Sequence, residues 1–173
     1  MTYAVKDVSL FETGAQKIQW VADKMPILNK IADMYRDQKP FSGYRIAMSI
    51  HLEAKTAYLA LKLKELGAEV YLTGCNPLST QDDVAAALVK EDMNVFAWYD
   101  CTEEEYENNL IKVLECKPHL VIDDGGDLVH LLHTKCKKYA EKVIGGCEET
   151  TTGVIRLHAM DGGGALMNQG IHG

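Results

Sequence analysis

Two adjacent carboxylates, Asp123 and Asp124, are the residues of this sequence best suited to chemistry. They follow three apolar residues at 120–122 and precede the glycine pair Gly125–Gly126. A short apolar run with two β-branched residues is typical of a buried strand, and glycines let the backbone turn sharply beside a ligand. Ligands bind at the carboxyl edge of open parallel sheets, so this segment is expected to deliver carboxylates to a binding site.

Three other polar clusters also follow predicted strands. One begins at His51, the second lies at 76–81 and the third at 148–150. Because parallel strands end at the same edge of a sheet, the four loops are expected to converge into one polar pocket. Carboxylates, a histidine and neutral hydrogen-bonding groups suit a polyhydroxylated or nucleoside-like ligand and proton transfer. The candidates are His51, Glu53, Lys55, Asn76, Ser79, Thr80, Gln81, Asp123, Asp124, Asp127, Glu148, Glu149 and Thr150.

Each cluster also has a purely structural interpretation. His51 can be a capped or solvated side chain, and Asp123 can cap the helix that follows it. Two adjacent acids cannot both cap one helix end, so Asp124 fits the structural interpretation less well. Glu148–Glu149 can be a solvated loop, and Thr150–Thr152 can be an ordinary helix start. These alternatives stay open at the level of sequence.

The cysteines predict neither a disulfide framework nor a metal site. Their number is odd, and no two have the Cys-x-x-Cys spacing of a zinc site. This usage is typical of a reduced cytoplasmic protein. Cys75 lies in a candidate loop, but a buried, unreactive thiol is the simpler interpretation. The five residues are Cys75, Cys101, Cys116, Cys136 and Cys147.

Composition limits the class of protein. The 173 residues are 47% hydrophobic and 25% charged, which fits one globular domain with a substantial core. The net charge of -7, without a run of Lys or Arg, argues against nucleic-acid or anionic membrane surfaces. No apolar stretch approaches the roughly 20 residues of a membrane-spanning helix, and Met1–Leu10 lacks the apolar core of a signal peptide. We therefore expect a cytoplasmic protein that binds neither nucleic acid nor membranes.

Alternating helix and strand patterns supply the elements that must position the polar clusters. Residues 9–36 carry an apolar stripe at spacings of three and four, interrupted by Pro26. The alternation predicts a three-layer α/β fold, Rossmann-like or flavodoxin-like, with a parallel sheet and helices on both faces. Gly162–Gly164 predicts a flexible tail rather than a phosphate-binding loop. Further helices are predicted at 53–66, 82–90, 102–114, 128–139 and 154–160, and strands at 44–50, 69–72, 94–98, 120–122 and 142–145.

Four motifs resemble, in their residues, order and spacing, those of the S-adenosylhomocysteine hydrolases (adenosylhomocysteinases). The resemblance extends from about Ser9 to Met167, and it also includes the segment that begins at Met25. It implies a substrate-binding α/β domain at residues 1–167 and an unmatched tail at 168–173. The four motifs are Ser49–Ala57, Cys75–Asp82, Ile122–Leu128 and Glu148–Gly153.

The resemblance implies reversible, NAD-dependent hydrolysis of S-adenosyl-L-homocysteine to adenosine and L-homocysteine. In this cycle the ribose 3′-hydroxyl is oxidised, homocysteine is eliminated, water adds and the ketone is reduced again. By the resemblance, His51 and Asp124 act as acid and base, and Glu149 holds the ribose hydroxyls. Glu53, Lys55 and Thr56 lie near the base, Asn76, Ser79 and Gln81 line the pocket, and Thr150, Thr151 and Thr152 contact NAD.

Two features depart from the family pattern. Many members have threonine and glutamate where this chain has Glu53 and Lys55, and this version resembles the archaeal and thermophile-type branch. Lysine only donates hydrogen bonds and a carboxylate only accepts them, so adenine and hypoxanthine both remain candidates for the base. The sequence also lacks the family's Asn-Asp-Ser-x-x-Lys segment and its NAD fingerprint. With the NAD-binding domain absent, the chain alone is expected to bind nucleosides weakly, without holding NAD and without turnover.

Other functions fit the same residues. The chain can be a non-catalytic nucleoside-binding or regulatory module that associates with full-length enzyme subunits, or part of a homo-oligomer. A generic flavodoxin-like nucleotide binder is a further alternative. Binding of adenosine, inosine or flavin mononucleotide distinguishes these hypotheses.

Overall fold

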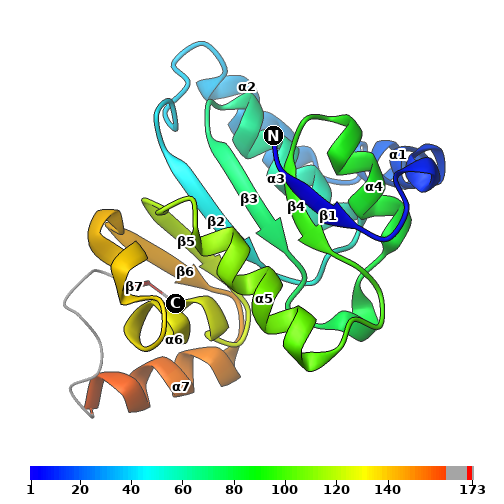
Figure 1. Ribbon diagram of the computed structural model, residues 1–173. Helices are drawn as coiled ribbons and strands as arrows, with labels where there is room; N and C mark the ends of the chain where they lie inside the picture. The colour runs from blue at the N-terminus through cyan, green and yellow to red at the C-terminus, as the bar shows by residue number, and fades with distance from the viewer. Residues whose placement is uncertain (163–170, 173) are drawn as a thin grey trace.

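The computed structural model describes residues 1–162 and the backbone of 171–172, and a parallel β-sheet forms its centre (Figure 1). The strand order is β1-β4-β3-β2-β5-β6-β7, and every neighbouring pair is parallel. The strands are β1 (Tyr3–Val5), β2 (Arg45–Ser49), β3 (Glu69–Thr73), β4 (Asn94–Ala97), β5 (Leu120–Asp123), β6 (Gly145–Glu148) and β7 (Ile171–His172).

Helices cover both faces of the sheet, as Figure 1 shows with α5 in front of the sheet and α3 behind it. The α-helices are α1 (Phe11–Ala22), α2 (Pro26–Tyr35), α3 (Ala54–Glu65), α4 (Asp82–Lys90), α5 (Glu103–Leu114), α6 (Asp127–His133) and α7 (Thr151–Gly162). Short 3-10 segments are η1 (Val8–Leu10), η2 (Pro77–Ser79) and η3 (Lys137–Lys142). Among the described residues, no helix is both long enough and apolar enough to cross a membrane.

Side chains alternate along each strand between two hydrophobic cores. Ile46 and Met48 of β2 pack with residues of α1, α3 and α4, whereas Ala47 between them packs with residues of α5, α6 and α7. In β4, Val95 belongs to the first core and Phe96 to the second. Two cores separated by one sheet confirm the predicted three-layer α/β architecture.

The strand order creates a crevice between β2 and β5. From β2 the chain proceeds outward to β3 and β4, and from β5 it proceeds in the opposite direction to β6. The series β4-β3-β2-β5-β6 follows the 3-2-1-4-5 order of Rossmann sheets and differs from the 2-1-3-4-5 order of flavodoxins. The Rossmann-like prediction is therefore confirmed. The loops after β2 and β5 separate at this point, where ligands bind in such sheets.

Most predicted elements are confirmed within a few residues. The long N-terminal helix divides as predicted, because Pro26 lacks an N–H and occupies the first position of α2. The helix predicted at 154–160 begins earlier, at Thr151. All five cysteines are free, as predicted. Of the predicted glycine tail, Gly162 ends α7, and Gly163 and Gly164 lie outside the described residues.

Three predictions about the C-terminal third and the sheet edges were wrong. The strand predicted at 142–145 lies at 145–148, so Glu148 extends the sheet instead of beginning a loop. Two glycines open this strand, and pairing with β5 overrides their low strand propensity. The helix predicted at 128–139 ends at His133, and η3 follows. The edge strands β1 and β7 were not predicted, because three and two residues carry no periodic signal.

Asp123 closes the junction between β5 and α6. Its side chain is fully buried, and Oδ2 accepts a hydrogen bond of 3.0 Å from the backbone N–H of Val129 in the first turn of α6. Oδ1 accepts a second, of 3.2 Å, from the N–H of Asp124. The capping interpretation of Asp123 is thus confirmed. Burial raises the pKa of this carboxyl to about 7, opposed by the Val129 hydrogen bond and reinforced by the nearby charge of Glu148.

Stability at the contact of α1 and α4 depends on Gly14. A Cβ at this position would lie 1.9 Å from the carbonyl oxygen of Asp83. We therefore expect Gly14→Ala to lower the free energy of unfolding by about 1–3 kcal/mol, although alanine favours the helix by about 1 kcal/mol. Urea denaturation measures the change. Gly162→Ala, where an added Cβ meets open space, is the control, and equal stability of both variants would contradict the prediction.

The buried Asp123 carboxyl makes stability depend on pH. Between pH 3.8 and about 7 the native state holds a proton that the unfolded state has released. The free energy of unfolding therefore falls as pH rises through this window, by up to about 1.4 kcal/mol per pH unit, and levels off above it.

We expect Asp123→Asn to lack this component, because its amide does not titrate. Urea denaturation at intervals between pH 4 and 8 measures it, and the exposed Asp100→Asn provides a matched control. If the Asp123→Asn and parent profiles run parallel across the window, Asp123 does not hold the proton.

Candidate active site

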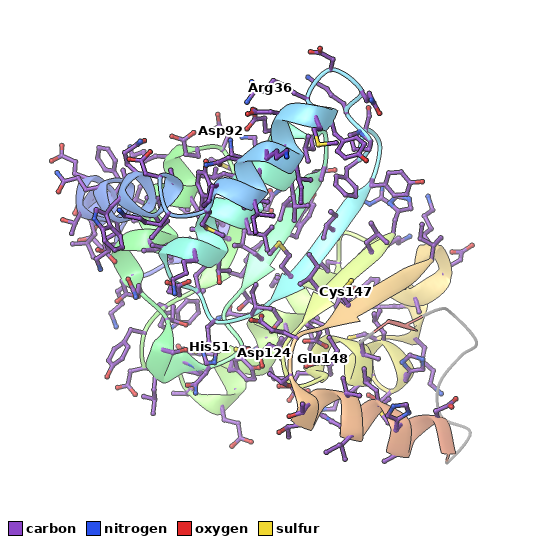
Figure 2. The ribbon with its side chains drawn as sticks, turned by 180° about the vertical axis from the view of Figure 1, so that it is seen from behind. Arg36, His51, Asp92, Asp124, Cys147 and Glu148 are labelled. Carbon is purple, nitrogen blue, oxygen red and sulfur yellow. The ribbon has the colours of Figure 1, made fainter. Side chains whose placement is uncertain are left out.

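A cavity of about 790 Å³ lies at the carboxyl edge of the sheet. Residues from the loops after β2, β3 and β6 meet there, and Figure 2 shows His51, Asp124 and Glu148 along this same edge. Three of the four predicted polar loops therefore converge in the cavity, whereas residues 123–127 of the loop after β5 do not line it. One part of the lining is polar and another is apolar. The cavity is lined by Met25, Ile50, His51, Glu53, Lys55, Thr56, Leu59, Ser79, Gln81, Ile122, Cys147, Glu148 and Glu149.

His51 enters the cavity from the end of β2 and is held from both sides. Its Nδ1 lies 2.6 Å from Ser79 Oγ. The Ser79 hydroxyl donates to the backbone carbonyl of Asn76 at 3.1 Å, so its oxygen accepts the hydrogen bond from Nδ1–H. A neutral imidazole carries one N–H, and this arrangement leaves Nε2 as the free acceptor nitrogen. A free Nε2 on an exposed ring is suited to taking up a proton.

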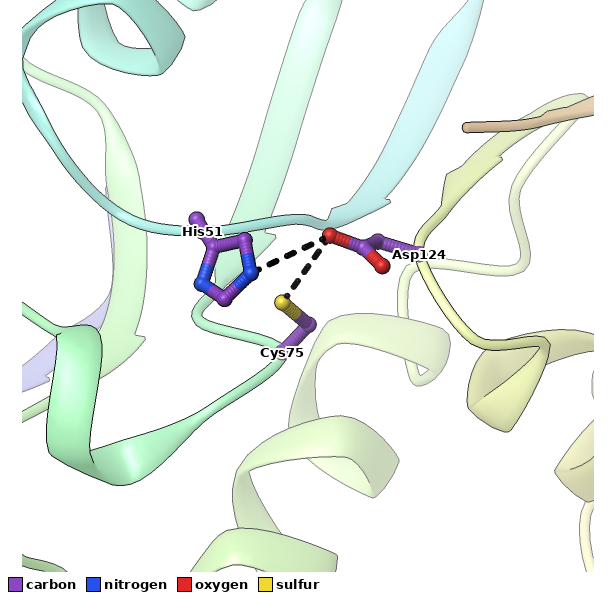
Figure 3. A group of neighbouring side chains, drawn as sticks. All are labelled: His51, Cys75 and Asp124. Carbon is purple, nitrogen blue, oxygen red and sulfur yellow. Dashed lines mark hydrogen bonds and ion pairs between the residues drawn. The ribbon is translucent and has the colours of Figure 1, made fainter. Parts of the chain in front are cut away.

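The Asp124 carboxylate lies beside the Nε2 atom of His51 (Figure 3). Its Oδ2 lies 3.7 Å from His51 Nε2, and its side chain is 11% exposed, compared with 53% for His51. The partly buried carboxylate thus faces the ring, and it can stabilise an imidazolium when His51 is protonated.

Cys75, in the loop after β3, contacts the same carboxylate. Its thiol donates to Asp124 Oδ2 with an Sγ–Oδ2 distance of 3.3 Å. Burial, and then the Asp124 charge, raise the pKa of this thiol well above its usual range. The thiol is therefore protonated at neutral pH, which agrees with the prediction of an unreactive cysteine.

The predicted base-binding residues stand at the start of α3. Glu53 caps this helix, because its Oε1 accepts from the backbone N–H groups of Lys55 at 3.0 Å and Thr56 at 3.3 Å. The cap fixes the carboxylate on the cavity wall. Lys55 is exposed beside it, and Thr56 is buried.

Glu148 joins the loops that follow β5 and β6, a role that sequence reasoning missed. Its Oε1 accepts from Gly125 N at 2.8 Å, Thr150 N at 3.0 Å and Thr150 Oγ1 at 2.9 Å. Its Oε2 is buried and has no hydrogen-bond partner among the described residues. The sequence offered one clue, the glycine at position 153. The structure explains it, because a Cβ at Gly153 would lie 2.1 Å from Glu148 Oε1.

The neighbours of Glu148 divide between the cavity and helix α7. Glu149 is exposed and lines the cavity. Thr150 caps α7, since its Oγ1 accepts from Gly153 N at 3.0 Å, as the helix-start interpretation predicted. Thr151 and Thr152 are exposed in the first turn of α7 and do not line the cavity.

Several other candidates have structural roles. Asn76 is exposed and outside the cavity lining, and its Oδ1 accepts from Leu78 N at 2.9 Å, which caps η2. Thr80 Oγ1 donates to the carbonyl of Asn76. Gln81 lines the cavity. Asp127 accepts from Tyr106 at 2.9 Å and pairs with Arg156 at 2.6 Å, so it joins helices α5, α6 and α7.

The apolar lining was not predicted. Met25, Ile50, Leu59 and Ile122 line the cavity, whereas the residues predicted to line it were all polar. A cavity lined by both apolar and polar groups is typical of a small-molecule site.

The sequence is similar to those of several known proteins. The family model described as S-adenosyl-L-homocysteine hydrolase matches residues 2–142. An S-inosyl-L-homocysteine hydrolase of Methanocaldococcus jannaschii is 57% identical over 164 residues, which are 95% of this chain and 40% of that protein. The Methanococcus maripaludis protein of the same name is 54% identical over 94% of this chain and 39% of its own length. An adenosylhomocysteinase of Thermotoga maritima is 54% identical over 89% of this chain and 38% of its own length.

The chain thus spans about 40% of the length of these relatives. The family match covers well over half of the chain and includes the loops that carry His51, Cys75 and Asp124. The chain belongs to the S-adenosyl-L-homocysteine hydrolase family.

Proposed function

We propose that this chain forms the substrate-binding part of an enzyme that reversibly hydrolyses S-adenosyl-L-homocysteine to adenosine and L-homocysteine. The observation that carries the proposal is the cavity, in a chain of this family, that collects most of the predicted substrate-binding residues. Its volume of about 790 Å³ is within the range of small-molecule sites. Its apolar wall suits a planar base, and its polar wall suits a ribose.

His51 and Asp124 are proposed as the acid–base pair. His51 Nε2 is an available proton acceptor, and the Asp124 carboxylate lies 3.7 Å away. His51 thus exchanges a proton with the substrate, and Asp124 holds the ring and balances its charge. Glu149, exposed at the cavity, is proposed to accept hydrogen bonds from the ribose hydroxyls.

NAD is the proposed cofactor of the complete enzyme; when bound, it would supply the oxidation of the ribose 3′-carbon that makes the neighbouring C4′–H acidic. We propose that Thr150, Thr151 and Thr152 contact it from this chain. Thr151 and Thr152 are exposed at the N-terminal turn of α7, where hydroxyl and N–H donors are available to a ligand. The Thr150 hydroxyl is occupied by Glu148 and Gly153, so its contribution is to hold this turn in place.

S-inosyl-L-homocysteine is a second candidate substrate, because relatives named S-inosyl-L-homocysteine hydrolase match this chain at 57% and 54% identity. Lys55 only donates and Glu53 only accepts, and both line the cavity. One donor and one acceptor can serve the O6 acceptor and N1–H donor of hypoxanthine, or, with the partners exchanged, the N1 acceptor and 6-amino donor of adenine. Relatives with either name match this chain at similar identity, 57% and 54%.

We also propose how this chain assembles with other subunits and where it acts. Residues 1–167 act as the substrate-binding domain, and partner subunits of the homo-oligomer or full-length enzyme complete the site in the cytoplasm. A chain that binds nucleosides but associates with enzyme subunits without catalysis is the alternative. Co-elution with full-length enzyme in size-exclusion chromatography, combined with unchanged activity of that enzyme, would favour the alternative.

Nucleoside binding tests the role of the cavity. Calorimetric titration is expected to show binding of adenosine or inosine and none of flavin mononucleotide. Loss of a charged hydrogen bond at Glu149→Gln is expected to weaken binding of the preferred nucleoside about tenfold or more. The exposed Glu141→Gln, outside the cavity, is the control. Binding of the flavin alone would instead indicate a generic nucleotide binder.

Turnover tests the role of Asp124. In this chain joined to the remaining portion of its Methanocaldococcus jannaschii relative, Asp124→Asn is expected to lower kcat by roughly 10²–10⁴-fold and to change KM only a few-fold. The neutral amide no longer stabilises a protonated His51. Steady-state kinetics measures both constants, with the exposed Asp37→Asn as control. Equal losses in binding and turnover would mean that Asp124 only positions the substrate.

A further inference from the structure

Three side chains from three loops place different metal-binding atoms around one point. His51 follows β2, Cys75 follows β3 and Asp124 follows β5. One nitrogen, one sulfur and one oxygen atom of these side chains all lie within 4.8 Å of one another. Figure 3 shows the three side chains pointing toward one another. We propose that His51, Cys75 and Asp124 form a binding site for one thiophilic divalent cation of the zinc class.

The spacing of these atoms suits a tetrahedral cation. Zinc binds nitrogen and oxygen at roughly 2.0–2.2 Å and sulfur at roughly 2.3 Å, so two ligand atoms on one tetrahedral ion lie roughly 3.3–3.8 Å apart. Asp124 Oδ2 is 3.3 Å from Cys75 Sγ and 3.7 Å from His51 Nε2. Both separations are in this range, and the third pair, His51 and Cys75, lies within 4.8 Å.

Hydrogen bonds around the cluster prepare the histidine as a ligand. Ser79 holds His51 Nδ1 at 2.6 Å, and the backbone carbonyl of Asn76 accepts the Ser79 hydroxyl proton. The lone pair of Nε2 is therefore directed toward Asp124. Fixation of one ring nitrogen so that the other binds metal is the usual arrangement at protein metal sites.

Charge and proton balance are satisfied when the cation binds. The Cys75 S–H bond breaks, its proton passes to solvent, and a sulfur–metal bond forms. One thiolate and one carboxylate neutralise the two positive charges of the cation. Three protein ligands leave a fourth position, which accepts water or an added ligand.

The site departs from the sequence prediction of no metal centre. That prediction used the short Cys spacings of zinc motifs, and here the three ligands come from separate crossovers. The proposal is independent of the proposed function, because it requires only the three side chains and no nucleoside.

Cobalt and zinc titrations test the site. The chain is expected to bind one Co²⁺ with a sulfur-to-cobalt charge-transfer absorption band, and Zn²⁺ is expected to displace it. In Cys75→Ser the band is expected to disappear, and zinc affinity measured by competition is expected to fall at least about tenfold. His51→Gln and Asp124→Asn are expected to retain a weakened band.

Cys101→Ser and Cys147→Ser are the matched controls, and both are expected to behave like the parent chain. Cys147 is the exposed thiol of the cavity, so it is the main competitor for a soft cation. A band that persists in Cys75→Ser, or that is lost in Cys147→Ser, would overturn the proposal, as would the absence of cobalt binding. Circular dichroism verifies that Cys75→Ser folds. If Cys75→Ser does not fold, the weakened cobalt band expected for the exposed His51→Gln is the second test.

Discussion

Parallel pairing of β2 with β5 is the constraint on which the site depends. Ser49 at the end of β2 pairs with Asp123 at the end of β5, so the residues that follow, His51 and Asp124, emerge at the same level of the sheet. The chain winds outward from these two strands in opposite directions, which leaves the space between their loops open. A slip of this register would separate the histidine from the carboxylate and would also misplace the thiol of Cys75.

Two buried carboxylates hold the loops that follow β5 and β6 in place. Asp123 connects β5 to α6, and its register partner Glu148 connects the loop after β5 to the start of α7. Neither side chain meets solvent freely, so both act on the backbone. Of their neighbours, the partly buried Asp124 faces His51, and the exposed Glu149 lines the cavity. In each adjacent acidic pair, the first carboxylate therefore stabilises the backbone and the second is available to the site.

The cluster of His51, Cys75 and Asp124 suits both proton transfer and metal binding, because both require a histidine held in one orientation. A histidine with one fixed nitrogen and one free nitrogen serves proton transfer and metal binding alike. The carboxylate of Asp124 stabilises either an imidazolium or a cation. The thiol of Cys75, protonated beside it, adds sulfur to the set of ligands, and this distinguishes the cation site from a simple acid–base pair.

Local patterns in the sequence determined the elements and the edge at which they meet. The helix division at Pro26, the span of α4 at 82–90 and the convergence of loops around His51 follow from periodicity, proline chemistry and parallel topology, which act within a few residues or apply to any such sheet. Only the tertiary structure decided that β6 begins at Gly145, that Glu148 rather than Glu149 anchors the loops, and that Cys75 meets Asp124. These contacts join separate crossovers, so they depend on strand order and register, which no local pattern encodes.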